Sequence, residues 1–544
     1  MIIDARSVST GAQIEADICI VGAGLAGLVL AREFIGTSVR ICLLESGGRD
    51  AEPAAPDSPP YCQNGGLPYA GPKMARARRF GGSTHQWNVP IDGDRFGARL
   101  RPLDPIDFEQ RDWVPGSGWP FPKTHLDPYY DKAQAICHVE PTSFEVDDWQ
   151  DQPNRALALS DDRVQTIIYK FVARDTLALG YTEEVSRANN ITSLLHADVL
   201  DLETPSIPDR ITRSRVATLN GTSFNVSAKL FILAGGGIEI PRLLLLSRKS
   251  TPNGLGNEND LVGRFFMEHP HFWQGIFVPN DGALLQSTAL YNEIHSVKGV
   301  AVIGKLALAE SVLRRERLLN QNVQLIPGRM PDPFKSRRPD LASVESFRTF
   351  ASAVLHGQSP GGVERHLKNI AGGLHEIAIA GARKVRNRLL GNEEILVYHF
   401  ANMMEQTPNP ESRVTLGSDR DVFGQLCAKL SWHIAPQDIR SAVRTQQILA
   451  EALESAGLGR FYSEMRGEEI PTNLEGGYHY MGTTKMHPNP RHGVVDADCR
   501  LHSVQNLFIA GPSVFPTSGY ANPVLTIIAM TLRLADHLKR EMSI

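Results

Sequence analysis

The sequence predicts an α/β fold, with a nucleotide-binding sheet assembled from separated segments and a second region built on an antiparallel sheet with helices. Three observations lead to this class. An apolar strand runs into a glycine-rich turn and a helix near residue 22, and a second strand–glycine–helix unit follows near residue 235. Two further stretches, at about 275–330 and 395–432, are rich in strand-like segments. Strand–helix units predict a parallel sheet, whereas consecutive strands predict an antiparallel one.

Length and composition indicate a globular protein of two or three domains, since 544 residues exceed what one core usually holds. Hydrophobic residues make up 42% of the chain and charged residues 21%, which is ordinary for such a protein. The formal net charge of −4 does not favour nucleic acid as a partner. The six cysteines lie far apart without a C-x-x-C pair, so we expect free thiols in a reducing compartment.

The N-terminal residues and the apolar runs of the chain do not predict a membrane segment. The N-terminal residues lack a basic segment followed by an apolar core, so a signal peptide is not expected. No apolar run reaches the ~20 residues that span a bilayer. We therefore expect a cytoplasmic protein without stable membrane insertion.

The first strand–helix unit contains a G-x-G-x-x-G motif made by Gly22, Gly24 and Gly27. The first glycine permits the tight turn, the second lets backbone approach a pyrophosphate, and the third lets helix and strand pack closely. A second apolar strand ends in Glu45, about 20 residues further on, where a carboxylate binds ribose hydroxyls. This acidic residue disfavours the 2′-phosphate of NADP, so FAD and NAD both remain at this point.

Several further segments, in the same order along the chain, resemble the glucose–methanol–choline (GMC) oxidoreductases. Besides the first motif they are RRFGGSTHQW at 78–87, FILAGGGIEIPRLLLLS at 231–247, DLVGRFFMEHP at 260–270, EQTPNPESRVTL at 405–416, GYHYMGTTKM at 477–486 and NLFIAGPSVFPTSGYANPVLTIIAM at 506–530. The active-site motifs look most like those of bacterial sugar and glycoside oxidoreductases, such as pyranose oxidase-like enzymes. The resemblance is weakest at 135–190 and 331–392.

The resemblance implies a Rossmann-like FAD-binding domain and a substrate domain built on an antiparallel sheet. The corresponding boundaries are 1–100, 191–272 and 486–544 for the FAD-binding domain, 101–190 for a segment that covers FAD, and 273–485 for the substrate domain. The substrate domain would contain a basic helical insertion at 331–392. We interpret this insertion as a solvated helical segment beside the substrate region, with a membrane-surface or partner-docking helix as the alternative.

The same resemblance implies oxidation of an alcohol by hydride transfer to flavin N5, with His479 and Asn522 as the catalytic pair. A neutral imidazole suits the role of base because its unperturbed pKa is about 6.5. The Asn522 amide would hold the hydroxyl in place. The pair Asn522-Pro523 also predicts a helix start, with Asn522 as cap and Pro523 at the first helical position. We expect the positive end of that helix to face the isoalloxazine.

The cofactor-binding positions implied by these motifs lie in five parts of the chain. They are Gly22, Gly24, Leu25, Ala26 and Gly27; Glu45 and Ser46; Arg79, Gly81, Gly82, Ser83, His85, Trp87 and Asn88; Val199, Ala234 and Gly235; and Gly511, Ala521, Asn522 and Pro523.

His85 raises the question of a covalent cofactor. Some members of the family link FAD to a histidine in a Ser-Thr-His-Trp sequence, but here Gln86 separates His85 from Trp87. We therefore expect non-covalent FAD, with a bond to His85 as the alternative.

Other kinds of activity are less well supported. The GQSPG string at 357–361 matches a nucleophile elbow, but Pro360 cannot supply the oxyanion N–H that follows the serine. No metal is expected, because no pair within one histidine-rich group has a usual ligand spacing. That group is His479, His487, His492, Asp496, Cys499 and His502.

The favoured substrate is a small-molecule alcohol, a sugar or glycoside, and a secondary alcohol of a natural-product pathway is the next candidate. A non-redox lyase on the same fold, or a flavin-binding partner without activity, are the alternatives from other classes. The sequence leaves oxygen, a quinone or another carrier open as the electron acceptor, and it leaves the oligomeric state open.

Overall fold

The computed structural model of the protein describes most of the chain. The described residues are 1–50, 62–63, 66–67, 69, 77–140, 143–151, 154–159, 162–281, 284, 289–329, 367, 396–463, 465, 467 and 469–544. The insertion predicted at 331–392 lies outside them except for residue 367, and so does the GQSPG string. Both stay predictions.

The first sheet is mostly parallel and combines distant parts of the sequence. Its strands lie in the order β1-β8-β3-β2-β11-β10-β9, with β21 paired to β11. Neighbours from β1 to β11 are parallel, as are β11 and β21, whereas β9 and β10 form an antiparallel ribbon. The strands are β1 (Ile2–Asp4), β2 (Gln13–Val21), β3 (Ile41–Glu45), β8 (Ile191–Leu195), β9 (Asp198–Glu203), β10 (Arg213–Ala217), β11 (Ser223–Leu233) and β21 (Leu507–Ile509). The predicted sheet from separated segments is confirmed.

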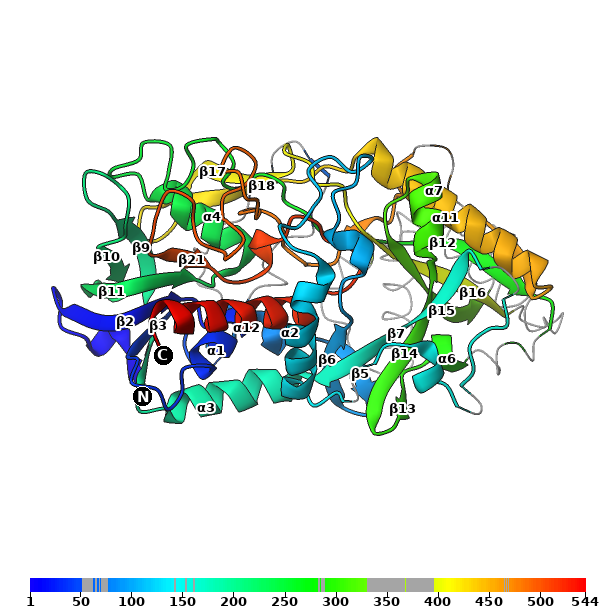
Figure 1. Ribbon diagram of the computed structural model, residues 1–544, viewed down its shortest axis with the longest axis horizontal. Helices are drawn as coiled ribbons and strands as arrows, with labels where there is room; N and C mark the ends of the chain where they lie inside the picture. The colour runs from blue at the N-terminus through cyan, green and yellow to red at the C-terminus, as the bar shows by residue number, and fades with distance from the viewer. Residues whose placement is uncertain are drawn as a thin grey trace.

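Helices cover both faces of this sheet, which explains why β3 and β21 are buried along their whole length. Figure 1 shows α1 (Leu25–Arg32), α3 (Tyr181–Arg187) and α12 (Val524–Glu541) on one side and α4 (Gly236–Leu246) on the other. The helix α2 (Lys123–Ile136) packs on α12.

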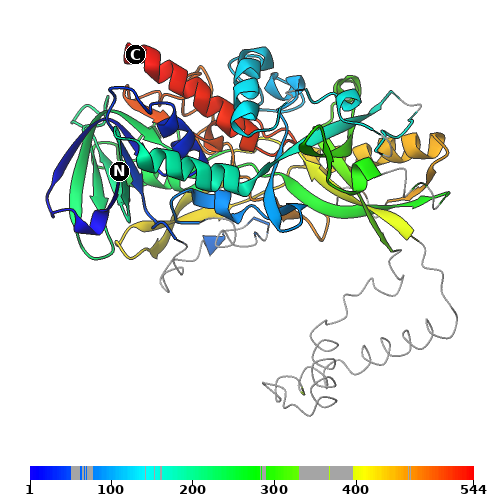
Figure 2. The ribbon, with the colours of Figure 1, turned by 90° about the horizontal axis from the view of Figure 1, so that it is seen from below.

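The second sheet is antiparallel throughout. Its strands lie in the order β19-β12-β16-β15-β14-β7-β6-β5, with β13 beside β14 and β20 beside β12. They are β5 (Val89–Asp92), β6 (Arg95–Leu100), β7 (Val164–Ala173), β12 (Pro270–Pro279), β13 (His295–Val297), β14 (Val300–Leu308), β15 (Gln321–Arg329), β16 (Leu396–Met404), β19 (Gly459–Tyr462) and β20 (Glu475–Gly476). The predicted α/β class with an antiparallel second sheet is thus confirmed, and Figure 2 shows the two sheets at opposite ends of the molecule.

The strands expected at about 395–432 divide between two sheets. β16 joins the second sheet, whereas β17 (Arg413–Arg420) and β18 (Leu426–Ser431) form a separate small sheet with β4 (Cys62–Gln63). The small sheet packs on α4, because Ile238 of that helix shares a buried cluster with Val414 and Leu430. Arg242 of α4 also donates to the Leu426 carbonyl oxygen at 2.9 Å. Contacts with a distant helix, which a local pattern does not show, separate these strands from β16.

The predicted domain boundaries stay a prediction. Strand pairing shows, however, that the second sheet includes strands from outside the range 273–485. β5, β6 and β7 lie in this sheet, although the boundaries assign 1–100 and 101–190 to other units. The cause is a long-range ladder, in which β7 pairs with β6 on one edge and with β14 on the other.

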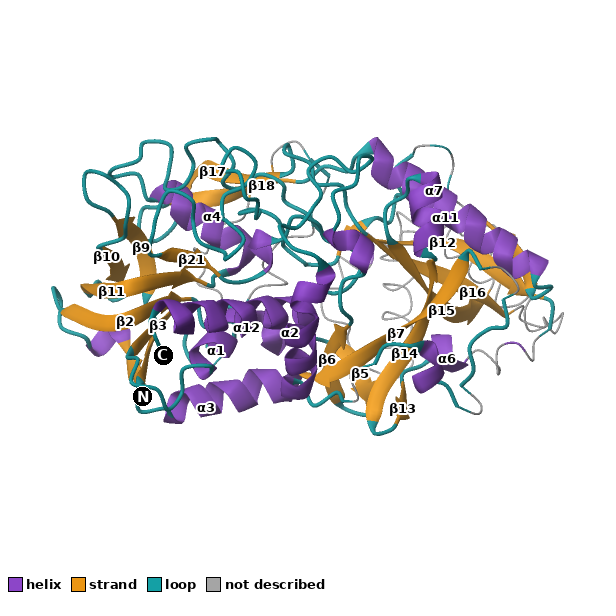
Figure 3. Cartoon of the chain, viewed as in Figure 1, coloured by secondary structure: helices purple, strands orange, loops and turns teal. Residues whose placement is uncertain are grey.

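The helices α6 (Ala289–Asn292), α7 (Glu310–Glu316) and α11 (Pro436–Ser455) lie beside the second sheet (Figure 3). Short helical segments elsewhere in the described chain are η1 (Ala5–Ser7), η3 (Gly82–Gln86), η4 (Pro105–Phe108), η5 (Val146–Asp148), η6 (Thr176–Gly180) and η8 (Pro512–Val514). None of the helices in the described part of the chain is both long and apolar enough to cross a bilayer.

Candidate active site

The glycine-rich turn between β2 and α1 is packed on two sides and open on the third. Gly22 has φ +104°, and a Cβ there would lie 2.8 Å from the carbonyl carbon of Ala234. A Cβ on Gly27 would lie 2.0 Å from the Gly22 carbonyl oxygen. A Cβ on Gly24, by contrast, would meet nothing within 4 Å. The predicted division of roles fits this geometry: two glycines allow close packing and the middle one faces free space.

The start of α1 fits an anionic ligand. Gly24 is the N-cap of this helix and no side chain caps it, so the N–H groups of Leu25, Ala26 and Gly27 in the first turn lack capping side chains. Unsatisfied N–H groups and the helix dipole together favour a phosphate at this position.

Glu45 holds the turn by its carboxylate. Oε2 accepts from the Ala23 N–H at 2.9 Å and Oε1 accepts from the Gly47 N–H at 2.8 Å. Ser46 donates to Oε1 at 3.4 Å. Burial raises the pKa of Glu45. Since each carboxylate oxygen has two acceptor sites, Glu45 can still bind the ribose hydroxyls of the predicted role.

The loop that contains Arg79 to Asn88 lies directly on the glycine-rich turn. Gly81 donates from its N–H to the Ala23 carbonyl oxygen at 2.9 Å. A Cβ on Gly82 would lie 2.8 Å from the Gly24 Cα. Arg79 forms a parallel bridge with Gly48. The structure therefore brings this predicted segment to the same place as the first motif.

His85 lies within this loop, beside Gly81. Its Nε2 is 3.0 Å from the Phe80 carbonyl oxygen, and since a carbonyl only accepts, Nε2 carries the proton. Burial lowers the pKa of His85. Ser83 accepts from the Ala77 N–H at 3.3 Å.

The remaining predicted cofactor positions differ in how closely they approach the turn. Gly511 and Ala234 come close, because the Ala234 N–H donates to the Val21 carbonyl oxygen at 2.7 Å and a Cβ on Gly511 would touch Ala26 at 3.9 Å. Gly235 is the N-cap of α4. For three other predicted positions no contact with the turn is observed among the described residues. Val199 is half-buried on β9, Trp87 is half-buried after η3, and Asn88 is exposed.

The segment before α12 differs from the predicted helix start. The helix begins at Val524 with Pro523 as its N-cap, and no side chain caps it. Asn522 is therefore not a capping residue, and the predicted start with Pro523 at the first helical position is wrong by one residue. The Asn522 side chain is turned toward His479 through Nδ2, and its Oδ1, the atom that a cap would use, accepts no hydrogen bond from the first turn of the helix.

His479 and Asn522 meet in the interior, 43 residues apart in sequence. Nδ2 of Asn522 lies 3.2 Å from Nε2 of His479. Asn522 is 7% exposed, alongside buried Ala521, and its Oδ1 is buried without a partner in the described structure. The amide oxygen of Asn522 is therefore available to a ligand, whereas Nε2 of His479 contacts the amide nitrogen.

His269, which the sequence offered only as part of a family-like segment, fixes the tautomer of His479. Nε2 of His269 lies 3.2 Å from the Ser518 carbonyl oxygen, so it donates, and Nδ1 of the neutral ring must accept. That Nδ1 is 2.9 Å from Nδ1 of His479, which therefore carries its proton there. It follows that Nε2 of His479, facing Asn522, is unprotonated.

The histidines are neutral because they are buried. Burial lowers the pKa of His269 to about 4 and that of His271 to about 3. Burial, with smaller effects from the neighbouring His269, His271 and Arg99, lowers the pKa of His479 well below its usual value. The base form of His479 is thus the resting form at neutral pH.

Glu268 holds the backbone that carries His479. Its Oε2 accepts from the His479 N–H at 2.9 Å, and Tyr69 donates a short hydrogen bond to its Oε1. The Glu268 N–H donates to Oε1 of Gln406 at 2.9 Å. Burial raises the pKa of Glu268 to about 7.

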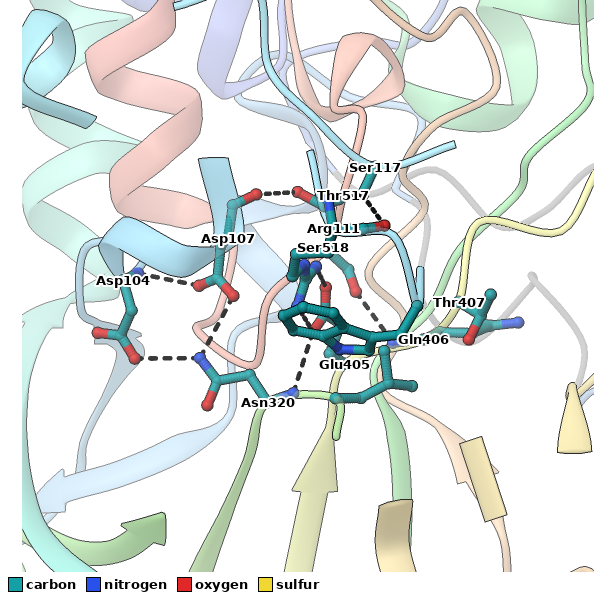
Figure 4. A network of polar contacts seen from close by, with 12 residues as sticks. Asp104, Asp107, Arg111, Ser117, Asn320, Glu405, Gln406, Thr407, Thr517 and Ser518 are labelled. Carbon is teal, nitrogen blue, oxygen red and sulfur yellow. Dashed lines mark hydrogen bonds and ion pairs between the residues drawn. The ribbon is translucent and has the colours of Figure 1, made fainter. Parts of the chain in front are cut away.

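A buried network holds Thr517 and Ser518, which precede Asn522 in the chain (Figure 4). The Thr517 hydroxyl donates to the Asp107 carbonyl oxygen at 2.6 Å. The Gln406 N–H donates to the Ser518 hydroxyl at 3.1 Å. Ser518 is thus held through its hydroxyl, while its carbonyl oxygen orients His269.

The centre of this network is an ion pair with no exposure to solvent. Arg111 donates through both terminal nitrogens to Glu405, whose Oε2 also accepts from the Asn320 N–H at 3.0 Å. The Asn320 side chain donates to Asp104 at 3.1 Å and to Asp107 at 3.3 Å. Burial, together with the nearby Glu405 and Asp104 carboxylates, raises the pKa of Asp107 well above its usual value.

Comparison with known proteins gives a family match for the C-terminal part of the chain. Residues 408–531 match the model of the family described as GMC oxidoreductase. This part of the chain is therefore similar to the GMC oxidoreductases.

Relatives of this oxidoreductase extend over its whole length. It is 23% identical to the fructose dehydrogenase large subunit of Gluconobacter japonicus, over 97% of this chain and 98% of that protein. It is 22% identical to the 6'''-hydroxyparomomycin C oxidase of Streptomyces lividus, over 96% and 92%. A structure of Aspergillus oryzae formate oxidase, solved in work on FAD modification, superimposes with a TM-score of 0.54 at 16% identity, over 98% and 100%.

Proposed function

We propose that this GMC oxidoreductase uses FAD to oxidise an alcohol to a carbonyl compound, with His479 as the base and Asn522 as the group that positions the hydroxyl. The observation that carries the proposal is the contact of 3.2 Å in which Asn522 Nδ2 donates to the unprotonated Nε2 of His479, because a hydroxyl that enters between them can take over both partners. A base and a hydrogen-bond donor at this separation can both reach one oxygen atom.

The protein's part in the reaction is the removal of one proton. An alcohol oxygen between the pair would donate its proton to His479 Nε2 and accept a hydrogen bond from Asn522 Nδ2. His269 keeps the lone pair on the correct nitrogen, so it acts as a positioning residue. As the hydroxyl proton leaves, His479 becomes an imidazolium that still donates from Nδ1 to His269.

FAD fits the glycine-rich turn and the two uncapped helix starts of the described structure. The free space at Gly24 and the uncapped start of α1 suit a pyrophosphate. The uncapped N-terminus of α12, next to Asn522, adds partial positive charge that stabilises a negatively charged ring. Bound FAD supplies the acceptor for the hydride of the alcohol carbon. The donation from His85 Nε2 to Phe80 supports FAD that is held without a covalent bond.

The substrate class follows from the relatives. The names of the two curated relatives refer to fructose and to hydroxyparomomycin C, a sugar and an aminoglycoside. We accordingly place a carbohydrate alcohol first among the substrates of this enzyme.

The test is an anaerobic screen of the purified holoenzyme against sugars, glycosides and simple alcohols. Loss of the visible band of oxidised flavin with one of them is the expected result, and readmission of air then shows whether oxygen restores it. A flavin that stays oxidised with every alcohol, as expected for a lyase, would overturn the proposal. Acid precipitation adds the cofactor linkage, because non-covalent FAD stays in the supernatant.

A further inference from the structure

Two cationic side chains point from the same face of the second sheet. Arg99 of β6 pairs with Phe171 of β7, and Lys305 of β14 pairs with Ile167 on the other edge of the same strand. Directly opposed residues share a face, and so do residues two or four apart in one strand. Phe171, Tyr169 and Ile167 therefore place Arg99 and Lys305 on one face.

Two neutral polar residues extend this face across the next strands. Asn322 of β15 pairs with Ala307, two residues from Lys305, and also with Met403 of β16. His271 of β12 pairs with Met403 on its far side. We refer to Arg99, Lys305, Asn322 and His271 together as the polar sheet face.

The polar sheet face lies against the segment that carries Asn522. Lys305 Nζ donates to Oδ1 of Asn322 at 3.1 Å, and Asn322 Nδ2 donates to the Tyr169 hydroxyl at 3.2 Å. Tyr169 in turn donates to the Tyr520 carbonyl oxygen at 3.3 Å. Three hydrogen bonds thus connect Lys305 to a residue two positions before Asn522.

His479 also lies near the polar sheet face. The ring centroid of His271 lies 6.4 Å from that of His479. His271 Nε2 is buried and has no hydrogen-bond partner in the described structure. The polar sheet face therefore lies near both His479 and the segment that carries Asn522.

The two cations of this face lack a counter-charge. Lys305 is 4% exposed and contacts an amide oxygen, not a carboxylate. Arg99 makes no hydrogen bond or ion pair with any described residue, and its Nε is buried. The buried Arg111 shows the contrast, because Glu405 neutralises it.

Burial of a basic group without a counter-charge is unfavourable, so a site that keeps Lys305 buried and Arg99 half-buried in this way needs a reason. Burial lowers the pKa of Lys305 well below its usual value, and the charge of Arg99 lowers it further. A bound anion would supply the missing counter-charge to both residues. The planar guanidinium of arginine matches a carboxylate in shape, with two parallel hydrogen bonds.

We propose that the polar sheet face binds a carboxylate of the substrate, so that the preferred alcohol is a sugar acid or a glycoside of one. This inference rests on the proposed function, because the bound carboxylate places a hydroxyl of the same molecule at His479 and Asn522. His271 and Asn322 would contribute hydrogen bonds to the neutral part of the sugar.

The first experiment compares matched substrates with the holoenzyme. Methyl β-D-glucuronide and methyl β-D-glucoside differ only in the carboxylate, and D-glucuronate and D-glucose form a second pair. We expect kcat/KM for anaerobic flavin reduction to be at least about tenfold higher with the acid of each pair. Lys305→Met and Arg99→Gln should each remove most of this preference, whereas Lys298→Met, in the exposed turn between β13 and β14, should keep it.

The second experiment measures anion binding without turnover. Acetate should perturb the visible flavin spectrum and raise the Tm of the wild-type holoenzyme, and Lys305→Met should lose both effects. In the absence of acetate this variant should be at least as thermostable as wild type, because it removes an unpaired buried charge. If it folds poorly, Lys305→Gln keeps a hydrogen bond to Asn322 and serves in its place.

The outcomes separate this inference from the proposed function. Neutral glycosides oxidised as fast as their acids, with no effect of acetate, would overturn the carboxylate site and leave the alcohol oxidation intact. A preference for glucose 6-phosphate over glucuronate would overturn the assignment of a carboxylate. An acetate effect that depends on Lys305, with no alcohol oxidised at all, would support the anion site and overturn the proposed function.

Discussion

The interaction of His269 with His479 can be tested with His269→Asn and His269→Gln, whose side chains differ in length by one methylene group. The amide of asparagine places its oxygen near the position of the His269 Nδ1, so His269→Asn retains an acceptor for the His479 Nδ1–H. The amide of glutamine reaches the position of Nε2, so His269→Gln retains the contact with Ser518 but loses the acceptor. Both variants keep a polar side chain of similar size in the same buried site.

The expected effect follows from the hydrogen bond of 2.9 Å that joins the two rings. Without an acceptor, the buried Nδ1–H of His479 is unsatisfied, at a cost of ~1–3 kcal/mol. That cost favours the tautomer with the proton on Nε2, which cannot act as the base. Since each 1.4 kcal/mol is a factor of about ten in rate, we expect His269→Gln to reduce flavin about 10–100-fold more slowly. A complete change of tautomer sets the upper limit at about 10⁴-fold.

The assay is anaerobic rapid mixing with an alcohol that reduces the wild-type flavin. The limiting rate should fall in His269→Gln while the substrate concentration for half-saturation changes little, because the proton position and not the binding contact is altered. His269→Asn should recover most of the rate. Equal rates in both variants, or a His269→Gln variant as fast as wild type, would refute the tautomer argument; bound flavin and Tm control for misfolding.

Three further perturbations test other parts of the site. His479→Ala should retain FAD by absorbance and lose about 10²–10⁴-fold in flavin reduction, because the general base is absent. Gly27→Ala should lower both Tm and FAD content, since its Cβ would lie 2.0 Å from a backbone oxygen of the turn. Arg111→Met should cost about 3–5 kcal/mol in denaturant unfolding, because it leaves the Glu405 carboxylate buried and unpaired. Lowering the pH from 6.5 to about 4 should also reduce stability. The pKa of His269 is lowered to about 4 in the folded state, so the unfolded chain binds this proton at a higher pH than the folded chain does. A pH series of thermal unfolding should show a loss of up to ~3 kcal/mol from this residue.

The parts of the fold that the sequence predicted are those with local signals. The turn at Gly22 and Gly24 is set by backbone conformation and close packing, which a glycine pattern reports directly. The strands on either side are apolar because they are buried between helices. Their assembly into one sheet followed from the repeated strand–glycine–helix pattern and the resemblance to a family.

The features that the sequence did not predict depend on contacts between residues far apart in the chain. β5, β6 and β7 joined the second sheet through ladders between residues up to about 145 positions apart, such as Val164 and Leu308, and no local pattern reports such pairing. The predicted start of α12 was wrong by one residue because an Asn-Pro pair does not show whether the asparagine caps the helix or contacts another residue. In the structure the Asn522 side chain contacts His479.

The catalytic pair was predicted as residues, but the group behind it was not. His269 stood in the sequence only as one of 17 histidines within a family-like segment. Its part depends on Ser518, which lies 249 positions away, and on the direction of two ring nitrogens. The one available signal was its place in a segment resembling the family, next to Glu268, and that signal gives no chemical role.

Ser518 has a consequence that reaches beyond the reaction itself. Its hydroxyl belongs to the network around the Arg111–Glu405 pair, and its carbonyl oxygen accepts from His269, which contacts His479. Through Ser518, the packing of the interior can therefore affect the basicity of His479 Nε2. Amino-acid replacements in that interior, remote from any substrate, can therefore alter how readily His479 takes a proton while the protein still folds. Directed evolution of this enzyme should accordingly find activity-changing positions in its best-packed region as well as around its substrate.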